Sequence, residues 1–431
     1  MTLSSPFFIF LFLPIVFTLY YISKKEWNYV TLFIISYLYL FFCFGKNPAT
    51  YIYLLLVSVC AYLLPLINQK KKIFKGLSTE VLFLSLFVIM RLLFATGIFT
   101  LPKALPFFDI LLVLNAVNYV KGIINNDYPV EKNVLKVFSY LSFFPSLIVI
   151  PNVSYKEFTT SLITRKVFSD ATYKNTSLLM SGFVKRIILC YMFSSVYELL
   201  CTYPSLSAPE AVLGIVCAVL LLLFEYTSTY QICTALSGLF GINELHEYSL
   251  NITRGIRTFS YSLMPFTQDF GKTLPLFFAL ILPTVIRPAP QTYLIGLFIA
   301  ILLLVQNKLK PVILYRILSC ITVLTGMLFF SMPYIRLKEF LSAIILLKPL
   351  SVTSKTFLIF NRQTLFVFIL LFIIVISPLV KKLLASKVKN ENFFELFDFV
   401  QYIILCLAFV FAIIYFLPSN GVLSHTLFPL I

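Results

Sequence analysis

Histidine, tryptophan and acidic residues are scarce in this sequence. Its 431 residues include two histidines, one tryptophan and 17 Asp or Glu. His246 lies in the polar stretch INELHEYS and His425 in the C-terminal tail, so we interpret both as solvated histidines rather than general bases. The sequence contains no GxSxG motif, no phosphate-binding loop and no cluster of metal ligands. It therefore carries no motif of a serine hydrolase, a P-loop enzyme or a metalloenzyme.

The eight cysteines are scattered, and no two of them form a CxxC pair. Paired spacing is the usual sign of a zinc site or a redox motif. We therefore predict no metal site and no disulfide framework, and we interpret the cysteines as small apolar residues inside membrane spans.

No hydrophilic stretch is long enough to form a separate soluble domain. The chain is 60% hydrophobic and 12% charged, with a mean hydropathy of +0.96. Runs such as 31–44, 211–224 and 364–380 approach or reach the roughly 20 apolar residues that cross a bilayer. We count about eleven such segments. The sequence predicts an all-α, polytopic membrane protein with a single domain over residues 1–431, its N-terminal apolar run being a retained first span.

The net charge of +17 does not indicate nucleic-acid binding. Lys and Arg lie between apolar runs, which is the positive-inside pattern and favours contact with anionic membrane lipid. Lys24 and Lys25 follow the first span and belong inside, which places the N-terminus outside. We expect a multi-pass protein of the inner (cytoplasmic) membrane.

The apolar run 135–151 is predicted not to cross the membrane. It contains two prolines, and crossing would carry a set of basic residues to the outer face. These residues are Lys156, Arg165, Lys166, Lys174, Lys185 and Arg186. We therefore predict a re-entrant segment, followed by cytoplasmic helices over 156–185 that lie on the membrane surface.

Two stretches place polar groups in apolar surroundings. The stretch 225–231 (EYTSTYQ) brings Glu225, Tyr230 and Gln231 within two helical turns, and Arg287 lies among prolines in 281–296. Charges at membrane depth are costly and face a partner or a cavity. These residues are therefore candidates to line a polar cavity, while a buried structural pair is the alternative for Glu225.

The stretch 225–242 (EYTSTYQICTALSGLFGI) aligns without a gap on the pattern DFSGYSDIAIGLARLFGI. Further segments match other motifs of the same group of proteins, in order along the chain: the opening SSPFFIFLFLPIVFTLYY, 101–122, 139–157, 321–340 and 413–416. Together these segments resemble the membrane-bound O-acyltransferase (MBOAT) family, in the branch of bacterial alginate O-acetyltransferases and teichoic-acid D-alanyl transferases.

The resemblance implies a tunnel through the membrane, an acyl donor such as acetyl-CoA on the cytoplasmic side, and an extracytoplasmic partner protein that completes transfer to an acceptor. It also implies a catalytic histidine, but this chain has Ile286 at that position. The second family histidine falls at Ser260, and Gln231 replaces the motif aspartate. Arg257 survives from the motif around Ser260.

Three interpretations follow from these departures. In the first, the protein is a catalytically silent or impaired member of an envelope O-acylation system. In the second, it is an active acyltransferase with a displaced base at Glu225, Tyr230 or His246, with Arg257 steadying the donor or Arg287 acting electrostatically. In the third, it is a lipid or polysaccharide transporter that shares only the fold.

Overall fold

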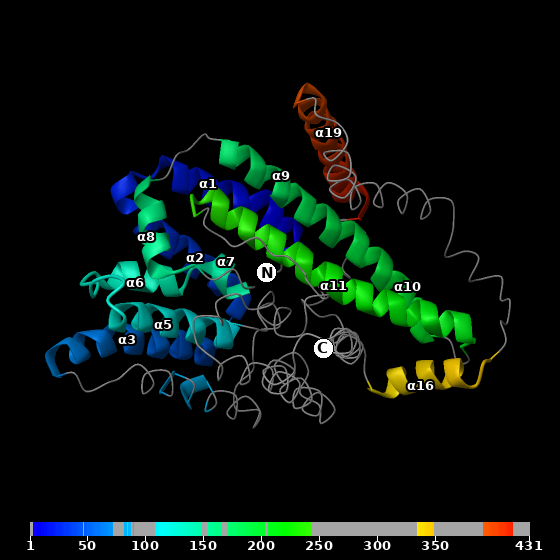
Figure 1. Ribbon diagram of the computed structural model, residues 1–431, viewed down its shortest axis with the longest axis horizontal. Helices are drawn as coiled ribbons and strands as arrows, with labels where there is room; N and C mark the ends of the chain where they lie inside the picture. The colour runs from blue at the N-terminus through cyan, green and yellow to red at the C-terminus, as the bar shows by residue number, and fades with distance from the viewer. Residues whose placement is uncertain are drawn as a thin grey trace, which may run out of the picture.

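The computed structural model describes residues 3–45, 47–71, 82–83, 85–87, 89, 108–148, 153–164, 170–202, 206–242, 334–348 and 391–416. Within these ranges the regular secondary structure is helical, and no strand is present (Figure 1). Four of the helical segments are long and apolar enough to cross a membrane: Lys25–Phe44, Pro48–Ile67, Ala171–Cys201 and Ala208–Leu239. The predicted all-α polytopic membrane fold is confirmed, and the number of about eleven spans stays a prediction.

The elements follow one another along the chain with short connections at the N-terminal end. They are η1 (Phe8–Phe12), α1 (Leu13–Ile22), η2 (Lys25–Trp27), α2 (Asn28–Phe44), α3 (Pro48–Lys71), α5 (Phe108–Ile124), α6 (Val134–Leu141), α7 (Phe144–Ile148), α8 (Tyr155–Thr164), α9 (Asp170–Val184), η3 (Lys185–Leu189), α10 (Cys190–Thr202), α11 (Ala208–Leu239), α16 (Tyr334–Ile345) and α19 (Glu391–Phe416).

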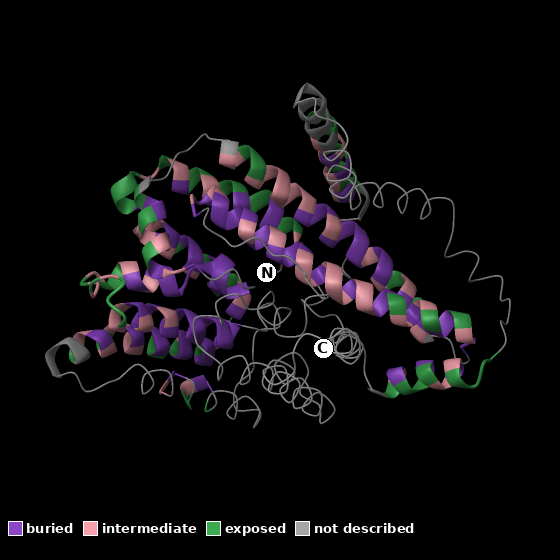
Figure 2. Ribbon diagram, in the orientation of Figure 1, coloured by how far each residue is buried: buried purple, intermediate pink, exposed green. Residues whose placement is uncertain are grey.

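The N-terminal helices pack around α7, a five-residue helix whose residues are all buried. The ring of Phe144 lies 4.6 Å from that of Tyr39 on α2 and 6.1 Å from those of Phe12 and Phe240, measured between ring centroids. Next to it, α5 is buried along most of its length, as Figure 2 shows. The aromatic contacts of Phe144 thus join the start of the chain to the end of α11.

The segment 135–151 does not form one continuous helix. It begins with α6, breaks at Ser142 and Phe143, and resumes as α7. At about 1.5 Å per residue, neither piece approaches the thickness of a bilayer core. This break agrees with the prediction of a segment that does not cross the membrane.

The prediction for residues 156–185 needs a correction. Only α8 is a short separate helix, whereas residues from Ala171 onward belong to a 31-residue helix that is long and apolar enough to span. This helix comprises α9, η3 and α10, and it runs alongside α11 in Figure 1. The surface interpretation failed because Lys185 and Arg186 have polar partners on α11 and can therefore lie inside the helix pair.

Both ends of α11 are capped by side chains. At its N-terminus, Ser207 and Glu210 form a capping box, with the Ser207 backbone N–H 2.9 Å from Glu210 Oε2. At its C-terminus, the hydroxyls of Tyr20 and Tyr21 donate to the carbonyls of Phe240 and Leu239, each at 2.7 Å. Side chains of α1 therefore donate to carbonyls at the C-terminus of α11 that have no partner within the helix.

The C-terminal turn of α11 also has the backbone pattern of a Schellman motif. Ile242 N–H donates to the Ser237 carbonyl at 2.9 Å, and Gly241 N–H donates to the Gly238 carbonyl at 3.0 Å. Gly241 adopts a φ of 91°, which a glycine reaches without the steric cost of a Cβ. The LFGI sequence that ends the 225–242 motif thus stops the helix at a defined point.

Small residues let the two long helices approach closely. A Cβ at Gly182 of α9 would lie 2.7 Å from Ile232 Cγ1 and 3.2 Å from the Ser228 carbonyl oxygen of α11. A Cβ at Gly238 would overlap the side chain of Asn175. Close backbone approach at glycines is a common basis of helix association in membranes.

We expect Gly182→Leu to destabilise the protein, because the added side chain has no space between α9 and α11. Overpacking of this kind costs about 1–3 kcal/mol. Thermal unfolding of the full-length protein in detergent measures the loss, with Lys174→Leu at an exposed position of α9 as the control. Adding Ile232→Ala to Gly182→Leu should recover part of the loss, and equal Tm values for Gly182→Leu and the control would contradict the prediction.

Candidate functional site

A buried ion pair joins the two long helices. Arg186 Nη2 of η3 lies 3.6 Å from Glu225 Oε1 of α11, and each side chain is 6% exposed. Arg186 Nη1 also donates to the hydroxyl of Thr229, one turn further along α11. Thr229 in turn donates to the Glu225 backbone carbonyl at 2.7 Å. The guanidinium group is thus held by a carboxylate and a hydroxyl from the same helix face.

The π-helical segment η3 accounts for how the long helix presents two cations. Within Lys185–Leu189 the backbone hydrogen bonds span five residues instead of four, so that Cys190 N–H donates to the Lys185 carbonyl. A π segment inside an α-helix shifts the direction of the side chains around it, and such segments are frequent at functional sites. Here the consecutive residues Lys185 and Arg186 both find partners on α11.

The second contact lies beside the ion pair. Lys185 Nζ donates to Gln231 Oε1 at 3.0 Å, and both side chains are half-buried. Gln231 follows Glu225 by six residues, so the EYTSTYQ stretch supplies both acceptors. We call Lys185, Arg186, Glu225, Thr229 and Gln231 the interhelical polar site.

Two buried polar atoms of this site are not used in the hydrogen bonds described above. Arg186 Nε and Glu225 Oε2 are both buried, and neither has a hydrogen-bond partner among the described residues. Buried polar atoms without partners are uncommon in folded proteins and call for an explanation, such as a bound group or a functional role. Nε lies on the same edge of the guanidinium group as Nη2, so the side of Arg186 that faces Glu225 is held by charge at 3.6 Å rather than by a direct hydrogen bond.

The surroundings of the ion pair are of low polarity. The buried thiols of Cys190 and Cys233 lie within electrostatic range of it, as does the fully buried Tyr39 of α2. In such surroundings a charge pair interacts more strongly than in water, and an unpaired charge is more costly. The pair thus restricts how α9–α10 and α11 can be arranged.

The structure brings together some of the predicted site residues. Glu225 and Gln231 belong to the interhelical polar site, and Tyr230 is buried on the same helix at 5% exposure. The positions Arg257, Ser260, Ile286 and Arg287 lie outside the described residues, so their roles stay predictions.

Sequence reasoning missed Lys185 and Arg186 as site residues. It assigned them to the cytoplasmic surface because two adjacent basic residues usually mark the inside of a membrane. A usable signal was present, since both lie in an apolar run with Glu225 in the next one. Opposite charges in consecutive spans predict a pair when the connecting loop is short.

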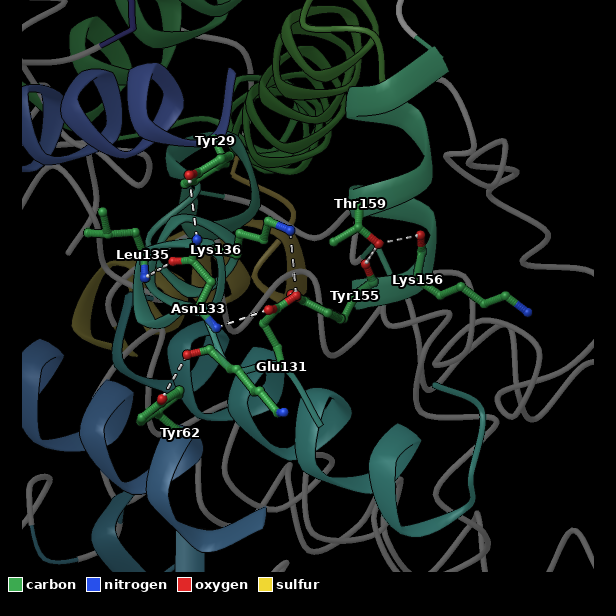
Figure 3. Close-up of polar contacts among 10 residues, drawn as sticks. Tyr29, Tyr62, Glu131, Asn133, Leu135, Lys136, Tyr155, Lys156 and Thr159 are labelled. Carbon is green, nitrogen blue, oxygen red and sulfur yellow. Dashed lines mark hydrogen bonds and ion pairs between the residues drawn. The ribbon is translucent and has the colours of Figure 1, made fainter. Parts of the chain in front are cut away.

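A second polar cluster, around Glu131, holds the connection between α5 and α6 in place (Figure 3). Glu131 Oε2 accepts from the Tyr155 hydroxyl at 3.0 Å and lies 3.8 Å from Lys136 Nζ, while Oε1 accepts from the Asn133 backbone at 2.9 Å. Asn133 caps α6 by accepting from Leu135 N–H at 3.0 Å. These contacts explain the loop geometry and α6 start, so we assign the cluster a structural role.

Tyr155 keeps its proton in this arrangement. Burial, and after it the neighbouring carboxylate of Glu131, raises the pKa of Tyr155. The hydroxyl therefore remains a hydrogen-bond donor to Glu131 through the physiological pH range.

Comparison with known proteins adds a weak similarity to one group. No family model matches the chain. The chain is 20% identical to a probable alginate O-acetylase AlgI of Pseudomonas putida over 296 residues, covering 63% of this chain and 60% of the relative. It is 21% identical to the proteins of the same name from Pseudomonas fluorescens over 281 residues (63% and 56%) and Pseudomonas syringae pv. tomato over 355 residues (72% and 68%).

The chain is weakly homologous to these probable alginate O-acetylases. It spans 60% and 56% of the length of the first two relatives, so the similarity does not cover either protein fully. The similarity is to the same branch of proteins that the sequence motifs resemble. Together with the apolar helices, it indicates an integral membrane protein.

Glu225→Gln should strongly destabilise the protein, because it leaves the Arg186 guanidinium buried without a carboxylate. Breaking a buried pair by removing one partner costs about 3–5 kcal/mol. Thermal unfolding of the full-length protein provides the measurement, and Glu198→Gln at an exposed position of α10 provides the control. The double variant Arg186→Met/Glu225→Gln should be more stable than Glu225→Gln alone. A double variant with the summed losses of the two single variants would show that the residues do not act as a pair.

Proposed function

We propose that this protein is a divergent MBOAT-like component of an envelope system that acylates an extracytoplasmic polysaccharide, and that its own transfer step is lost or impaired. The weak homology to probable alginate O-acetylases and the apolar helices support this proposal. In this proposal the protein lies in the cytoplasmic membrane with its N-terminus outside. An acyl donor such as acetyl-CoA and an extracytoplasmic acyltransferase partner are part of the same proposal.

One observation carries the proposed loss of activity. The chain has two histidines, and neither occupies a position that the family resemblance assigns to a histidine, where Ile286 and Ser260 stand instead. A general base near neutral pH contributes about 10²–10⁴-fold to a transfer reaction. Isoleucine cannot accept a proton from an attacking hydroxyl, so position 286 cannot supply that contribution.

A second candidate function is an active acyltransferase that uses Glu225 as a displaced base. The specific observation in its favour is Glu225 Oε2, a buried carboxylate oxygen that accepts no hydrogen bond within the described part of the chain. Against it, the ion pair with Arg186 already accounts for a carboxylate at this position. Tyr230 is the other candidate base on α11, and it is buried within the same EYTSTYQ stretch as Glu225.

The first test is acyl transfer by the full-length protein in proteoliposomes, with labelled acetyl-CoA outside and alginate in the lumen. The proteins encoded beside its gene are co-expressed so that a partner is present. We expect no transfer above a protein-free control for the natural sequence, and transfer for Ile286→His because the base is restored. Ile295→His, a substitution of the same type in the same stretch, should stay inactive. Transfer by the natural sequence would refute the loss of activity, and inactivity of every variant would favour a transporter.

The displaced-base candidate has a separate test in the same vesicles. If the natural sequence transfers acetyl groups, the charge-balanced variant Arg186→Met/Glu225→Gln removes the candidate carboxylate without leaving an unpaired cation. Loss of a general base predicts a fall of about 10²–10⁴-fold in the rate per folded protein. Tyr230→Phe tests the other candidate in parallel. Rates unchanged in both variants would exclude Glu225 and Tyr230 as the base.

A further inference from the structure

The short helix α16 is fixed to the N-terminal end of α11 (Figure 1). The backbone N–H of Ala208, the first residue of α11, donates to the Lys348 carbonyl at 3.0 Å. The ring of Phe340 is fully buried and fills the space beside Gly214, where a Cβ would overlap it. A hydrogen bond and a buried ring thus give α16 a defined place at this end of the helix.

The attachment point lies where α11 leaves the hydrocarbon core. The capping residues Ser207 and Glu210 are followed directly by the apolar run 211–224, and α11 is long and apolar enough to cross a membrane. The opposite end of α11 is bound by α1, and the lysines that follow α1 mark the cytoplasmic side in the predicted topology. This topology places α16 at the headgroup level of the outer leaflet.

The side of α16 that faces away from α11 exposes much apolar surface (Figure 2). Five large apolar side chains of this segment are between 41% and 79% exposed: Ile335, Leu341, Ile345, Leu346 and Leu347. Three of them are consecutive at the C-terminal end of the helix. Single exposed leucines are ordinary on a protein surface, whereas adjacent ones indicate a surface that contacts a membrane or another protein.

The backbone holds this apolar end in a strained turn. Leu347 N–H donates to the Ile344 carbonyl at 3.1 Å, and Lys348 N–H donates to the Ala343 carbonyl at 3.2 Å, which is the pattern of a Schellman motif. Leu347 has a φ of 45°, a left-handed conformation that glycine adopts at no steric cost and leucine adopts rarely. A leucine at this position indicates a contact for its side chain that outweighs the strain.

Basic side chains flank the exposed apolar residues. Lys338 and Lys348 are exposed, and Arg336 is paired with Glu339 at 2.7 Å. Lysines on the outer side run against the positive-inside pattern. Apolar residues beside lysines are typical of helices that lie in the membrane interface, where a lysine stem follows the apolar surface and its ammonium group reaches the lipid phosphates.

We propose that α16 is an interfacial anchor in the outer leaflet. Ile345, Leu346 and Leu347 insert between the acyl chains close to the headgroups, and Lys338 and Lys348 contact the lipid phosphates. The occupant of this surface is the bilayer, because α16 is attached where α11 leaves the core and because lysines flank its leucines. The anchor fixes the outer end of the α10–α11 pair at the membrane surface.

The inference goes beyond the proposed function, because contact with lipid requires no acyl transfer. A silent protein and an active one would both have the anchor. A failed transfer assay therefore leaves the inference standing, and a failed test of the anchor leaves the proposed function standing.

The depth of α16 can be measured by tryptophan fluorescence, because Trp27 is the chain's single tryptophan. Leu346→Trp is introduced into a full-length Trp27→Phe background and placed in phosphatidylcholine nanodiscs. The lipid carries bromine either near the headgroup end or near the methyl end of its acyl chains, and iodide is the quencher in water. We expect loss of fluorescence with bromine near the headgroup end, a smaller loss with bromine near the methyl end, and the smallest loss with iodide.

Two matched variants in the same background calibrate the measurement. Asn125→Trp, at an exposed position after α5, should be quenched by iodide and by neither brominated lipid. Val216→Trp, on an exposed side of α11, should be quenched by bromine and not by iodide. Ile345→Trp repeats the test at a second exposed position of α16, so that the result does not depend on the folding of one variant.

The quenching pattern decides between the possible occupants of the surface. Quenching of Leu346→Trp and Ile345→Trp by iodide alone would show that water covers α16, and quenching by neither agent would show that protein covers it. Either outcome overturns the proposal. Adding Lys338→Glu/Lys348→Glu should weaken quenching by bromine and strengthen quenching by iodide, because carboxylates are repelled by phosphates. Quenching that is unchanged by this double substitution overturns the assigned role of the lysines.

Discussion

Pairing charge at membrane depth is the constraint on which the described helices depend. An unpaired Arg or Glu at the centre of a span costs about 2.5–3.5 kcal/mol on insertion scales. Arg186 and Glu225 lie on different helices, so neither helix can slide or rotate without separating the two charges. The π segment directs Arg186 toward α11, and Gly182 permits the close approach of the two helices. Both features are needed for the register in which the pair forms.

The polar contacts that hold the two helices together and the groups that the family resemblance expects to carry out acyl transfer are different sets of residues. The helix pair retains a dense set of polar contacts over the EYTSTYQ stretch, while the positions expected to carry histidine hold Ile286 and Ser260. A buried ion pair between two helices contributes to their packing whether or not the protein transfers a group. A buried carboxylate such as Glu225 is therefore by itself no sign of catalysis, because the ion pair with Arg186 is a structural reason for its presence.

The sequence predicted the class of fold. For Glu225 it predicted cavity lining, with a buried structural pair as the alternative, and it did not predict which residue the partner is. Hydropathy alone reveals long apolar helices, since their length follows from the thickness of the bilayer. The positive-inside rule misplaced Lys185 and Arg186, because it reads charge along the chain and cannot see an acceptor on a neighbouring helix. Register between helices depends on three-dimensional features, here the π segment and the contact at Gly182, that leave no periodic signal in the sequence.

The tyrosine caps on α11 have a consequence for the order of biogenesis. The Tyr20 hydroxyl and its acceptor, the Phe240 carbonyl, are 220 residues apart in the chain. At about 5–20 residues per second, the ribosome takes roughly 10–40 s to make that interval. During this time the carbonyls that accept from Tyr20 and Tyr21 have not yet been synthesised. The helix α1 thus forms these hydrogen bonds only after 220 further residues have been synthesised, and removing α1 would leave the last turn of α11 without its tyrosine donors.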